Sequence, residues 1–519
     1  EYNNQKAPAA FYTVGIEETA GTNADPLNNG WQYSKKITIL ASEVAGVVTN
    51  FPLLIKTTDP DWADTSHGGY VAQSDGGDIL FLAGNRITKL DHEIESYDEA
   101  TGELVAWVEV LSLSDSQDTD IYIFYGNANA VDQWNPPPGA GVWEPNYVGV
   151  WHLNDDYADS TWNGNILTAA SSPVHATGQF ANGVDFDGTD DVLFRDDVDL
   201  IGSIPAKSAG SPDDWTITAW AKPDSGSVTD RRPIASKMEN GVAVPGNVRG
   251  FLFTADYSDP DKVVVVQVYE DDTPTFTETT SSDAVVENDW NFLAVTYDYV
   301  SSGSSRMRTY IDGSSNGSAS SDNAVGPTQG IPQRLNVGAY IWNPTGSRWF
   351  FKGVLDEVRI CKTARSAAWI ETEHNNQKTD STFYVIDDDW VGPCWDANYA
   401  YRKKITITAG SADIPADYSV SVTLDHAALV SGGKSLASGD DLRVVHWDGS
   451  SWTEIDRVLE PLSAWDDAST QIWFALADPI SASGTDSTYY LHYGYSSASN
   501  PPDDWASVFM VGDDFNDTT

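Results

Sequence analysis

The sequence predicts an all-β, multidomain protein in which β-sandwich and jelly-roll domains follow one another in tandem. Its 519 residues exceed what a single core usually holds, which favours three or four domains. Trp, Tyr, Thr and Val are abundant beside Gly, Ser, Asp and Asn, a composition typical of strands joined by tight turns. Short segments of alternating polarity recur along the chain, as in sandwiches and jelly rolls.

Individual strands follow from this alternation. "WTITAWA" at 215–221 alternates, and "WNFLAVTYD" at 290–298 with "RMRTYIDGS" at 306–314 predicts a strand pair. "KVVVVQVYE" at 262–270 is apolar enough for a strand buried on both faces. The one helical pattern is "SAAWIETEHNN" at 366–376, which predicts a short helix. No run of 18 apolar residues occurs, so we expect no membrane insertion.

The chain repeats part of itself. Residues 1–12, "EYNNQKAPAAFY", match 373–384, "EHNNQKTDSTFY", at a constant offset. "YSKKITI" at 33–39 likewise matches "YRKKITI" at 401–407, and later strands match at a similar spacing. We interpret the chain as an internal stretch of a longer tandem array, with chance similarity as the alternative.

The repeats and the composition shifts predict five segments. They are the tail of a preceding unit (1–18), a first β-sandwich module (31–140), a larger jelly-roll domain (143–376), a second copy of the module (397–505) and the start of a further unit (506–519). Joints rich in Pro, Gly and Trp at 134–145 and 387–397 suggest packed rather than loose connections.

Charge and cysteine content limit the partners. The net charge of −48 repels nucleic acid and anionic lipid and attracts cations. It fits either the acidic surface of a secreted or halophilic protein, or calcium sites, or both. Cys361 and Cys394 are the two cysteines, and they form either one disulfide or two buried thiols. The scattered histidines make a zinc site unexpected.

Residues 148–376 resemble the laminin-G-like, or concanavalin A-like lectin, family. The resemblance is carried by "VWHLNDDYADSTWNGN", "GQFANGVDFDGTDDVLF", "WTITAWAKP", "LNVGAY" and "GVLDEVRICKTARSAAWI", in the family's order. It implies a two-sheet jelly roll whose first and last strands pair.

The resemblance also implies binding sites. Calcium at the domain rim would use loop acids and amides, here Asp159, Asn165, Asp185, Asp187 and Asp356. For Asp187 the alternative is a plain turn, and for Asp356 a carboxylate bonded to neighbouring backbone. Sugar binding would use aromatic platforms, for which the candidates are Trp162, Trp342 and Trp349. The alternative is that these rings pack against a neighbouring module.

The two smaller modules resemble a family of unassigned function that occurs beside laminin-G-like domains in large prokaryotic surface proteins. The resemblance rests on "YSKKITI" and "YRKKITI", on "GDDLRV", and on "TYYLHYGYSSA". Its basic pairs, Lys35-Lys36 and Lys403-Lys404, are either solvated strand residues or docking points for an acidic neighbour.

Catalytic patterns are weak. The literal G-x-S-x-G at 313–317 lies in a polar turn with no helix after it, which argues against a nucleophile elbow. Glycosidases need two carboxylates at one bond, and the nearest pairs are Glu93 with Glu95 and Asp356 with Glu357, in different domains. We therefore expect no enzyme unless an acid pair assembles across domains.

Two functions remain. One is a structural or adhesive extracellular or cell-surface protein, a tandem array that extends or polymerises into a filament or lattice through other copies of itself. The other is a calcium-dependent carbohydrate-binding array, serving as an adhesin or as the targeting part of a polysaccharide-degrading protein. In a filament, an edge strand of one chain could complete a sheet of the next.

Overall fold

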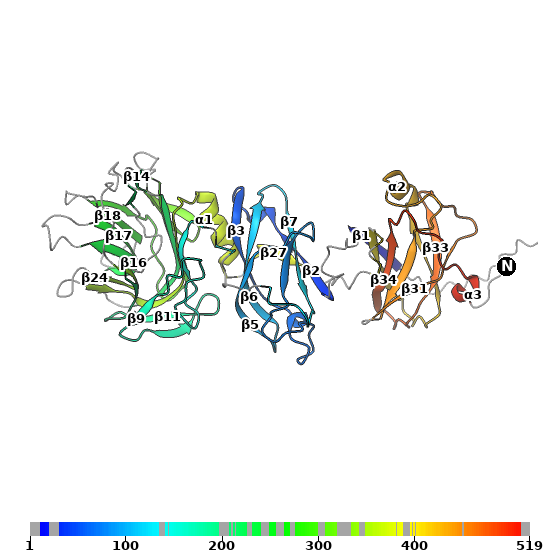
Figure 1. The fold of residues 1–519 in the computed structure, drawn as a ribbon, viewed down its shortest axis with the longest axis horizontal. Helices are drawn as coiled ribbons and strands as arrows, with labels where there is room; N and C mark the ends of the chain where they lie inside the picture. Colours follow the sequence, from blue (N-terminus) through cyan, green and yellow to red (C-terminus); the bar gives the residue numbers. More distant parts are fainter. Residues whose placement is uncertain are drawn as a thin grey trace, which may run out of the picture. The chain divides into compact units, whose positions relative to one another are not determined.

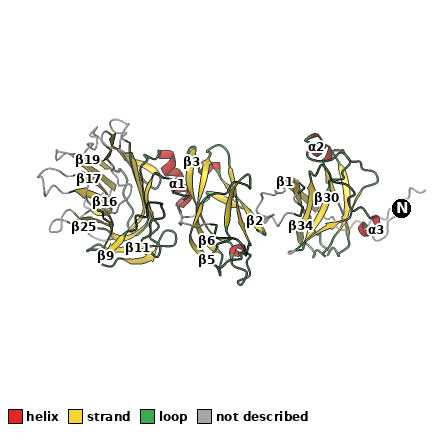
Figure 2. Cartoon of the chain, in the orientation of Figure 1, coloured by secondary structure: helices red, strands yellow, loops and turns green. Residues whose placement is uncertain are grey.

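Two compact units make up the chain in the computed structural model. The large unit is Ser34–Trp390, and the small unit combines Glu1–Tyr33 with Val391–Thr519. The structure describes residues 11–19, 31–133, 141–143, 145–196, 207–208, 211–212, 214–225, 231–239, 249–255, 264–269, 276–298, 307–318, 334–341, 348–379, 381–387, 395–396, 398–399, 401–448 and 451–509. Strands dominate both units (Figure 2), so the all-β, multidomain prediction is confirmed.

The first part of the large unit, module 1, is a sandwich of two antiparallel sheets. One sheet has the order β27-β2-β7-β4, and the other β3-β6-β5. The strands are β2 (Tyr33–Ile39), β3 (Val48–Thr58), β4 (Leu80–Ala83), β5 (His92–Asp98), β6 (Glu103–Leu113), β7 (Thr119–Tyr125) and β27 (Tyr384–Ile386), with 3-10 turns at Ala41–Glu43 and Pro60–Trp62. Ile121 and Ile123 of β7 face the core, as their alternation predicts.

Strand β6 departs from this alternation. Its residues 104–108 are all buried, although a sheet with one wet face buries only every second residue. One face therefore packs on the core of module 1, and the other packs on the jelly-roll domain.

The jelly-roll domain consists of a sheet of eight strands and a sheet of seven. The first contains β8 (Tyr147–Trp151), β10 (Val174–Thr177), β11 (Asn182–Asp187), β15 (Trp215–Pro223), β20 (Asn291–Tyr297), β21 (Met307–Ile311), β22 (Ser314–Ser318) and β26 (Lys352–Cys361). The second contains β9 (Thr168–Ala170), β12 (Val192–Arg195), β16 (Arg232–Glu239), β17 (Arg249–Ala255), β18 (Val264–Tyr269), β19 (Phe276–Thr280) and β23 (Leu335–Val337).

The core of this domain lies between its two sheets. Trp215, Ile217 and Ala219 of β15 meet Phe251 and Phe253 of β17 there. The first strand β8 pairs with the last strand β26, as the family resemblance implies. Short hairpins are formed by β13 (Lys207–Ser208) with β14 (Ser211–Pro212), and by β24 (Ala339–Ile341) with β25 (Arg348–Phe350).

Helix α1 (Ala367–Gln377) links the jelly-roll domain to module 1. It begins at Ser366, whose hydroxyl accepts a hydrogen bond from the amide of Trp369, a standard N-cap. The helix lies beside β3 of module 1 (Figure 1). The chain then enters β27, which joins the edge of module 1 next to β2. The predicted helix at 366–376 and the strand at 262–270, observed as β18, are both present.

The small unit contains module 2, whose strand order repeats that of module 1 with one strand, β31, added at the sheet edge. Its sheets are β1-β28-β34-β30-β31 and β29-β33-β32. The elements are β1 (Phe11–Thr19), β28 (Tyr401–Thr408), β29 (Ser419–Leu424), α2 (His426–Ser431), β30 (Arg443–Trp447), β31 (Trp452–Ile455), β32 (Arg457–Leu459), β33 (Thr470–Ala475), β34 (Thr485–Tyr493) and α3 (Trp505–Val508). Ile405, Val422, Phe474 and Leu491 are among its core residues.

Among the described residues, no helix is long and apolar enough to cross a membrane. Cys361 is buried, and its thiol donates to the carbonyl of Thr363 over 3.5 Å. Cys394 lies outside the described residues.

Candidate functional site

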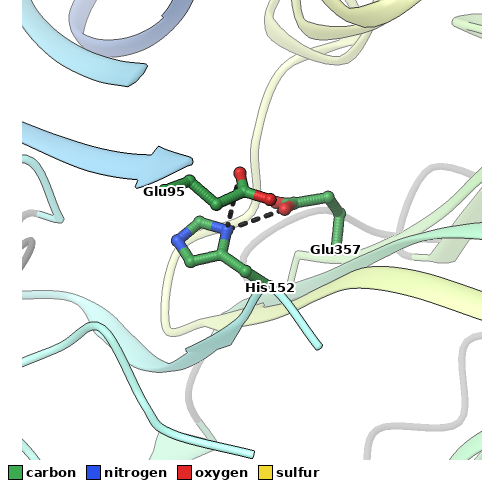
Figure 3. Close-up of side chains that lie close together, drawn as sticks. All are labelled: Glu95, His152 and Glu357. Atoms are coloured by element: carbon green, nitrogen blue, oxygen red, sulfur yellow. Dashed lines mark hydrogen bonds and ion pairs between the residues drawn. The ribbon is translucent and has the colours of Figure 1, made fainter. Parts of the chain in front are cut away.

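The two acidic pairs that the sequence places in different domains meet where module 1 contacts the jelly-roll domain. Glu93 and Glu95 come from β5, and Glu357 comes from β26. His152, one residue after β8, lies beside Glu95 and Glu357 (Figure 3). Its Nδ1 is 2.7 Å from Glu357 Oε1 and 3.6 Å from Glu95 Oε2, and its Nε2 is 3.4 Å from Glu93 Oε2. We call these four residues with Arg359 the ionic junction.

Two irregularities in the strands bring the carboxyl groups of Glu95 and Glu357 to the same place. The ladder between β5 and β6 shifts register between Ile94 and Ser96, which leaves Glu95 without a partner position. Strand β26 carries a bulge against β15, and Glu357 within it has a φ of 53°. A left-handed backbone is unfavourable for glutamate, and bulges commonly redirect a side chain. The fold therefore keeps a strained residue that points its carboxylate at His152.

Arg359 and two tryptophans complete the ionic junction. The Arg359 guanidinium donates to Glu357 Oε2 and to Glu373 Oε1, the latter at 2.9 Å. It also lies 4.2 Å from the Trp107 ring centre and 4.9 Å from that of Trp143. The two indoles donate to the acids of β5, Trp107 to Glu95 and Trp143 to Glu93, each over 2.8 Å. Charges from both domains are thus paired inside an aromatic cage.

Burial and charge set the protonation states. Burial lowers the pKa of His152, but the carboxylates of Glu357, Glu93 and Glu95 outweigh it and hold that pKa well above its usual value. Burial, and next the charge of Glu357, raise the pKa of Glu95 to about 8. Burial also disfavours the Glu357 carboxylate, yet His152 and Arg359 bring its pKa below the usual value. These shifts favour an imidazolium at His152, a carboxylate at Glu357 and a proton on Glu95.

These acids are sealed from solvent. Glu93 and Glu357 are 4% and 1% exposed, and the side chain of Glu95 is 2% exposed. A cavity of about 300 Å³ lies elsewhere on the same contact, and none of these acids lines it. Its walls are Leu54, Lys56, Gln179, Phe180, Asn376, Gln377, Lys378, Thr379, Ser381 and Tyr384. An acid pair does assemble across domains, but a glycosidic bond has no access to it in this conformation.

Two trios of side chains could hold a cation among the described residues. Glu95, His152 and Glu357 offer ligand atoms within 4.8 Å of one another, and so do Asp187, Asp190 and Asp191. In the first trio, His152 and Glu357 are directly hydrogen-bonded, so an ion would have to replace a proton there. The second trio contains one residue of the predicted calcium set, and its two neighbours were missed although "DGTDD" is a dense acidic run.

The predicted calcium ligands do not converge on one point. Asp159 and Asn165 lie together, because the Asn165 amide donates to Asp159 Oδ2 over 2.7 Å. Asp185 lies on β11 opposite Val354. Asp187 accepts from the Thr189 amide in a turn, over 2.7 Å.

Asp356 lies apart from the other predicted ligands. It is buried, and its Oδ2 accepts from the amides of Gln179 and Phe180. Asp187 thus lies in a plain turn, and Asp356 is bonded to backbone amides, as the two alternatives stated. Calcium binding by these residues stays a prediction.

Asp159 braces the loop after β8. Its carboxylate accepts from the amides of Val150, Thr161 and Asn165 and from the Thr161 hydroxyl. We expect Asp159→Ala to lower the free energy of unfolding by about 1–3 kcal/mol, because it leaves these donors unsatisfied. Urea unfolding of the full chain measures this, with the exposed Asp155→Ala as control. If calcium binds there, a chelator destabilises the wild type and leaves the variant unchanged; equal stability of all three chains would contradict the bracing role.

Candidate sugar platforms are found in two places. Trp162 is 66% exposed in the loop that follows Asp159. Trp349 of β25 is half-buried, and its ring lies 5.1 Å from the Tyr340 ring and 5.7 Å from the Arg231 guanidinium. Trp342 lies outside the described residues.

Trp349, on the two-stranded sheet β24-β25, packs on the face of the seven-stranded sheet that points away from the core. The cluster of Trp349 and Tyr340 packs on Leu252, whose neighbours Phe251 and Phe253 face the core. In register with Leu252 across the sheet lie Ser236 and Asn336. The Asn336 amide donates to the Ser236 hydroxyl over 3.4 Å, and its Oδ1 is buried with no hydrogen-bond partner in the described part of the chain. We call Leu252, Ser236, Asn336, Tyr340 and Trp349 together the outer-face row.

The sequence analysis predicted Trp349 as a sugar platform, but it did not predict Tyr340, Ser236 or Asn336 beside it. Asn336 could have been found, because the alternation in "LNVGAY" places Leu335 and Val337 in the core and Asn336 outward.

The fold is that of a concanavalin A-like jelly roll joined to smaller β-sandwiches. Residues 200–371 match the family described as the concanavalin A-like lectin/glucanases superfamily, and residues 75–143 match a domain of unknown function, DUF2341. Residues 397–505, the predicted second copy, share the strand order of module 1, but the match to this domain family covers 75–143 alone. No curated protein matched the sequence.

Solved structures with a similar fold include domain 4 of an extracellular arabinanase from Geobacillus stearothermophilus, in complex with arabinotriose. It is 17% identical with a TM-score of 0.33, over 44% of this chain and 98% of that chain. The sialidase CBM40 of Ruminococcus gnavus, bound to α2,3 sialyllactose, is 14% identical with a TM-score of 0.30, over 37% and 95%. Likeness at this level says nothing about what this chain binds.

Proposed function

We propose that the chain is a non-catalytic extracellular surface protein whose β-domains form stiff units of a structural or adhesive array. The observation that carries the proposal is the ionic junction, which fixes module 1 to the jelly-roll domain. Loosely joined domains share small, wet interfaces, whereas here five ionisable groups from both sides are buried and paired. Breaking such pairs exposes uncompensated charge, so the two domains are expected to move as one body.

A second set of contacts fastens the same two domains. Asn376 of α1 brackets the exposed edge of β3, accepting from the Leu54 amide over 2.7 Å and donating to its carbonyl over 3.0 Å. Within module 1, the Tyr384 hydroxyl of β27 contacts Lys56, two residues further along β3, in the same way: it accepts from the Lys56 amide over 2.9 Å and donates to the carbonyl over 3.0 Å. These side chains satisfy backbone groups that an edge strand leaves open, and so they block the edge against other partners.

Calorimetry of the full chain tests this stiffness. We expect module 1 and the jelly-roll domain to melt in one transition, because each buries a face against the other, and the small unit to melt in another. His152→Ala should split the first transition, since it removes the cation that lies between Glu93 of module 1 and Glu357 of the jelly-roll domain. Glu460→Gln in module 2 is the control. Separate transitions for module 1 and the jelly-roll domain in the wild type would contradict the proposal.

Carbohydrate binding is the second candidate function, and Trp349 favours it. Its half-buried ring, 5.1 Å from the ring of Tyr340, supplies the aromatic surface on which sugars stack. The match to a lectin and glucanase superfamily also supports it. The ligand would be a cell-surface or environmental polysaccharide, with calcium as a structural ion.

A polysaccharide array with the full chain, with calcium and with a chelator, tests this candidate. We expect Trp349→Ala to weaken binding about tenfold or more, as loss of a central aromatic contact does. Trp162→Ala distinguishes the loop position from the outer-face row, and Trp505→Ala, 41% exposed in the small unit, is the control. No saturable binding, or equal binding by all variants, would leave only the structural function.

A further inference from the structure

The segment that fastens the jelly-roll domain to module 1 occurs twice in the chain. Within 373–386, Asn375 donates to the Glu43 carbonyl over 3.0 Å, while Asn376 and Tyr384 bracket the edge of β3. Phe383 is buried and stacks on Phe51 at 6.1 Å. Residues 1–12 repeat this segment, and the attaching residues have counterparts there, namely Asn3, Asn4, Phe11 and Tyr12. The repeat therefore duplicates an attachment motif.

The strand that follows each motif pairs with a module in the same register. In β27, residues 384, 385 and 386 lie opposite Ile39, Thr38 and Ile37 of β2. In β1, the matching residues 12, 13 and 14 lie opposite Ile407, Thr406 and Ile405 of β28, which are the matching positions of module 2. Because a one-residue slip would reverse every side chain, equal register at both places indicates one specific acceptor edge in each module.

Acidic residues follow both strands, although not at matching positions, because β1 shifts register between Val14 and Glu17. In module 1, Lys36 of β2 forms an ion pair of 3.3 Å with Asp387, just beyond β27. In module 2, positions Glu17 and Glu18 of β1 lie opposite Lys403 and Arg402 of β28. Basic residues are scarce in this chain, 29 against 77 acidic ones, so their placement on this edge favours an acidic strand. Docking of an acidic neighbour by the lysine pairs stays a prediction, because Asp387 follows a strand of the same module.

We propose that β28 of one copy accepts residues 11–19 of a second copy, so that copies join head to tail. In the single chain described, β1 is the end strand of its sheet and pairs with β28 alone. The ladder is identical whichever copy supplies the strand, as in domain swapping and strand addition. Since the donor edge and the acceptor edge differ, each joined copy leaves one of each open, which gives an open chain. This goes beyond the stiff unit and rests on strand register, not on the ionic junction.

Protein concentration determines whether β28 pairs with residues 11–19 of its own chain or with those of a second copy. A tethered strand has an effective concentration of roughly millimolar order when its linker can span the sites. Refolding from urea at high protein concentration should therefore favour exchange between copies. Salt should favour it further, because copies with a charge of −48 repel one another.

Disulfide trapping tests the proposal in full-length chains carrying Cys394→Ser. Thr13 lies opposite Thr406, and facing positions on antiparallel strands are close enough for a disulfide. A Thr13→Cys chain and a Thr406→Cys chain are refolded together over a range of concentrations and oxidised. We expect a cross-linked dimer that increases with concentration. Thr13→Cys with Thr408→Cys, two residues out of register, is the control and should give little.

A chain that carries both Thr13→Cys and Thr406→Cys tests whether β1 pairs with β28 in this register, because a disulfide then forms within one chain. If it closes within one chain while the mixed single variants never cross-link, exchange between copies is overturned. If neither forms a disulfide, or if the out-of-register pair links equally well, the acceptor edge is overturned. None of these results depends on the stability of the ionic junction, so the proposed function stands or falls separately.

Discussion

Replacing Arg359 with methionine is expected to destabilise the large unit by about 3–5 kcal/mol, the usual effect of removing one partner from a buried ion pair. Arg359 is 2% exposed and is the cation that pairs with both Glu357 and Glu373. Methionine keeps much of the volume between Trp107 and Trp143, so the loss reports charge more than packing. Urea unfolding of the full chain, followed by tryptophan fluorescence, measures the shift.

Lys352→Met is the matched control, because Lys352 lies on the same strand but forms an exposed pair with Asp224 at 3.6 Å. Exposed pairs contribute about 0–1 kcal/mol, so this variant should unfold close to the wild type. Equal effects of the two substitutions would show that the ionic junction contributes no more than a surface ion pair.

Stability of the large unit is expected to fall as pH rises from about 5 to 9, and Glu95→Gln should remove much of that fall. The pKa of Glu95 is raised to about 8 from 4.5, so between these values the folded state holds a proton that the unfolded state has lost. The raised pKa of His152 acts in the same direction, with its contribution complete below the unfolded value and lost as pH passes the folded one.

Two neighbours modify this dependence. Asp356, whose pKa burial raises well above its usual value, adds to the fall, whereas Glu357, whose pKa is lowered, stabilises at neutral pH and loses that effect only in acid. We expect Glu95→Gln to equal the wild type near pH 5 and to exceed it at pH 9 by at least about 1.4 kcal/mol, the value of one pKa unit.

Glu460→Gln is the control for this measurement. Glu460 accepts a hydrogen bond from Trp473 in module 2 over 2.6 Å, as Glu95 does from Trp107, but it is half-buried. Its substitution should leave the pH dependence unchanged. A wild type whose stability is flat or rises from pH 5 to 9, with no gain in Glu95→Gln, would show that Glu95 is ionised in the folded protein.

Local sequence patterns predicted the fold because each strand carries its own signal. The alternation in β15 and the apolar run of β18 are properties of a few consecutive residues, and so is the N-capped helix α1. The resemblance to concanavalin A-like domains added the pairing of β8 with β26, which no local pattern contains.

The ionic junction could not be predicted in this way. Glu93 and Glu357 are separated by more than 260 residues, and each belongs to a strand whose own pattern is ordinary. Only the shared face of β6, with Trp107 in its centre, brings them together. Continuous apolar character at 104–108 was the available signal, because it marks a strand covered on both faces.

The most direct test of the central claim, that module 1 and the jelly-roll domain form one cooperative body, is hydrogen exchange of the full chain with Arg359→Met against wild type. The substitution lies in β26 of the jelly-roll domain. We expect protection to fall together in β26, in α1 and in strands β5 and β6 of module 1, while β33 and β34 of module 2 stay unchanged. Loss of protection confined to the jelly-roll domain, with β5 and β6 unaffected, would contradict the account.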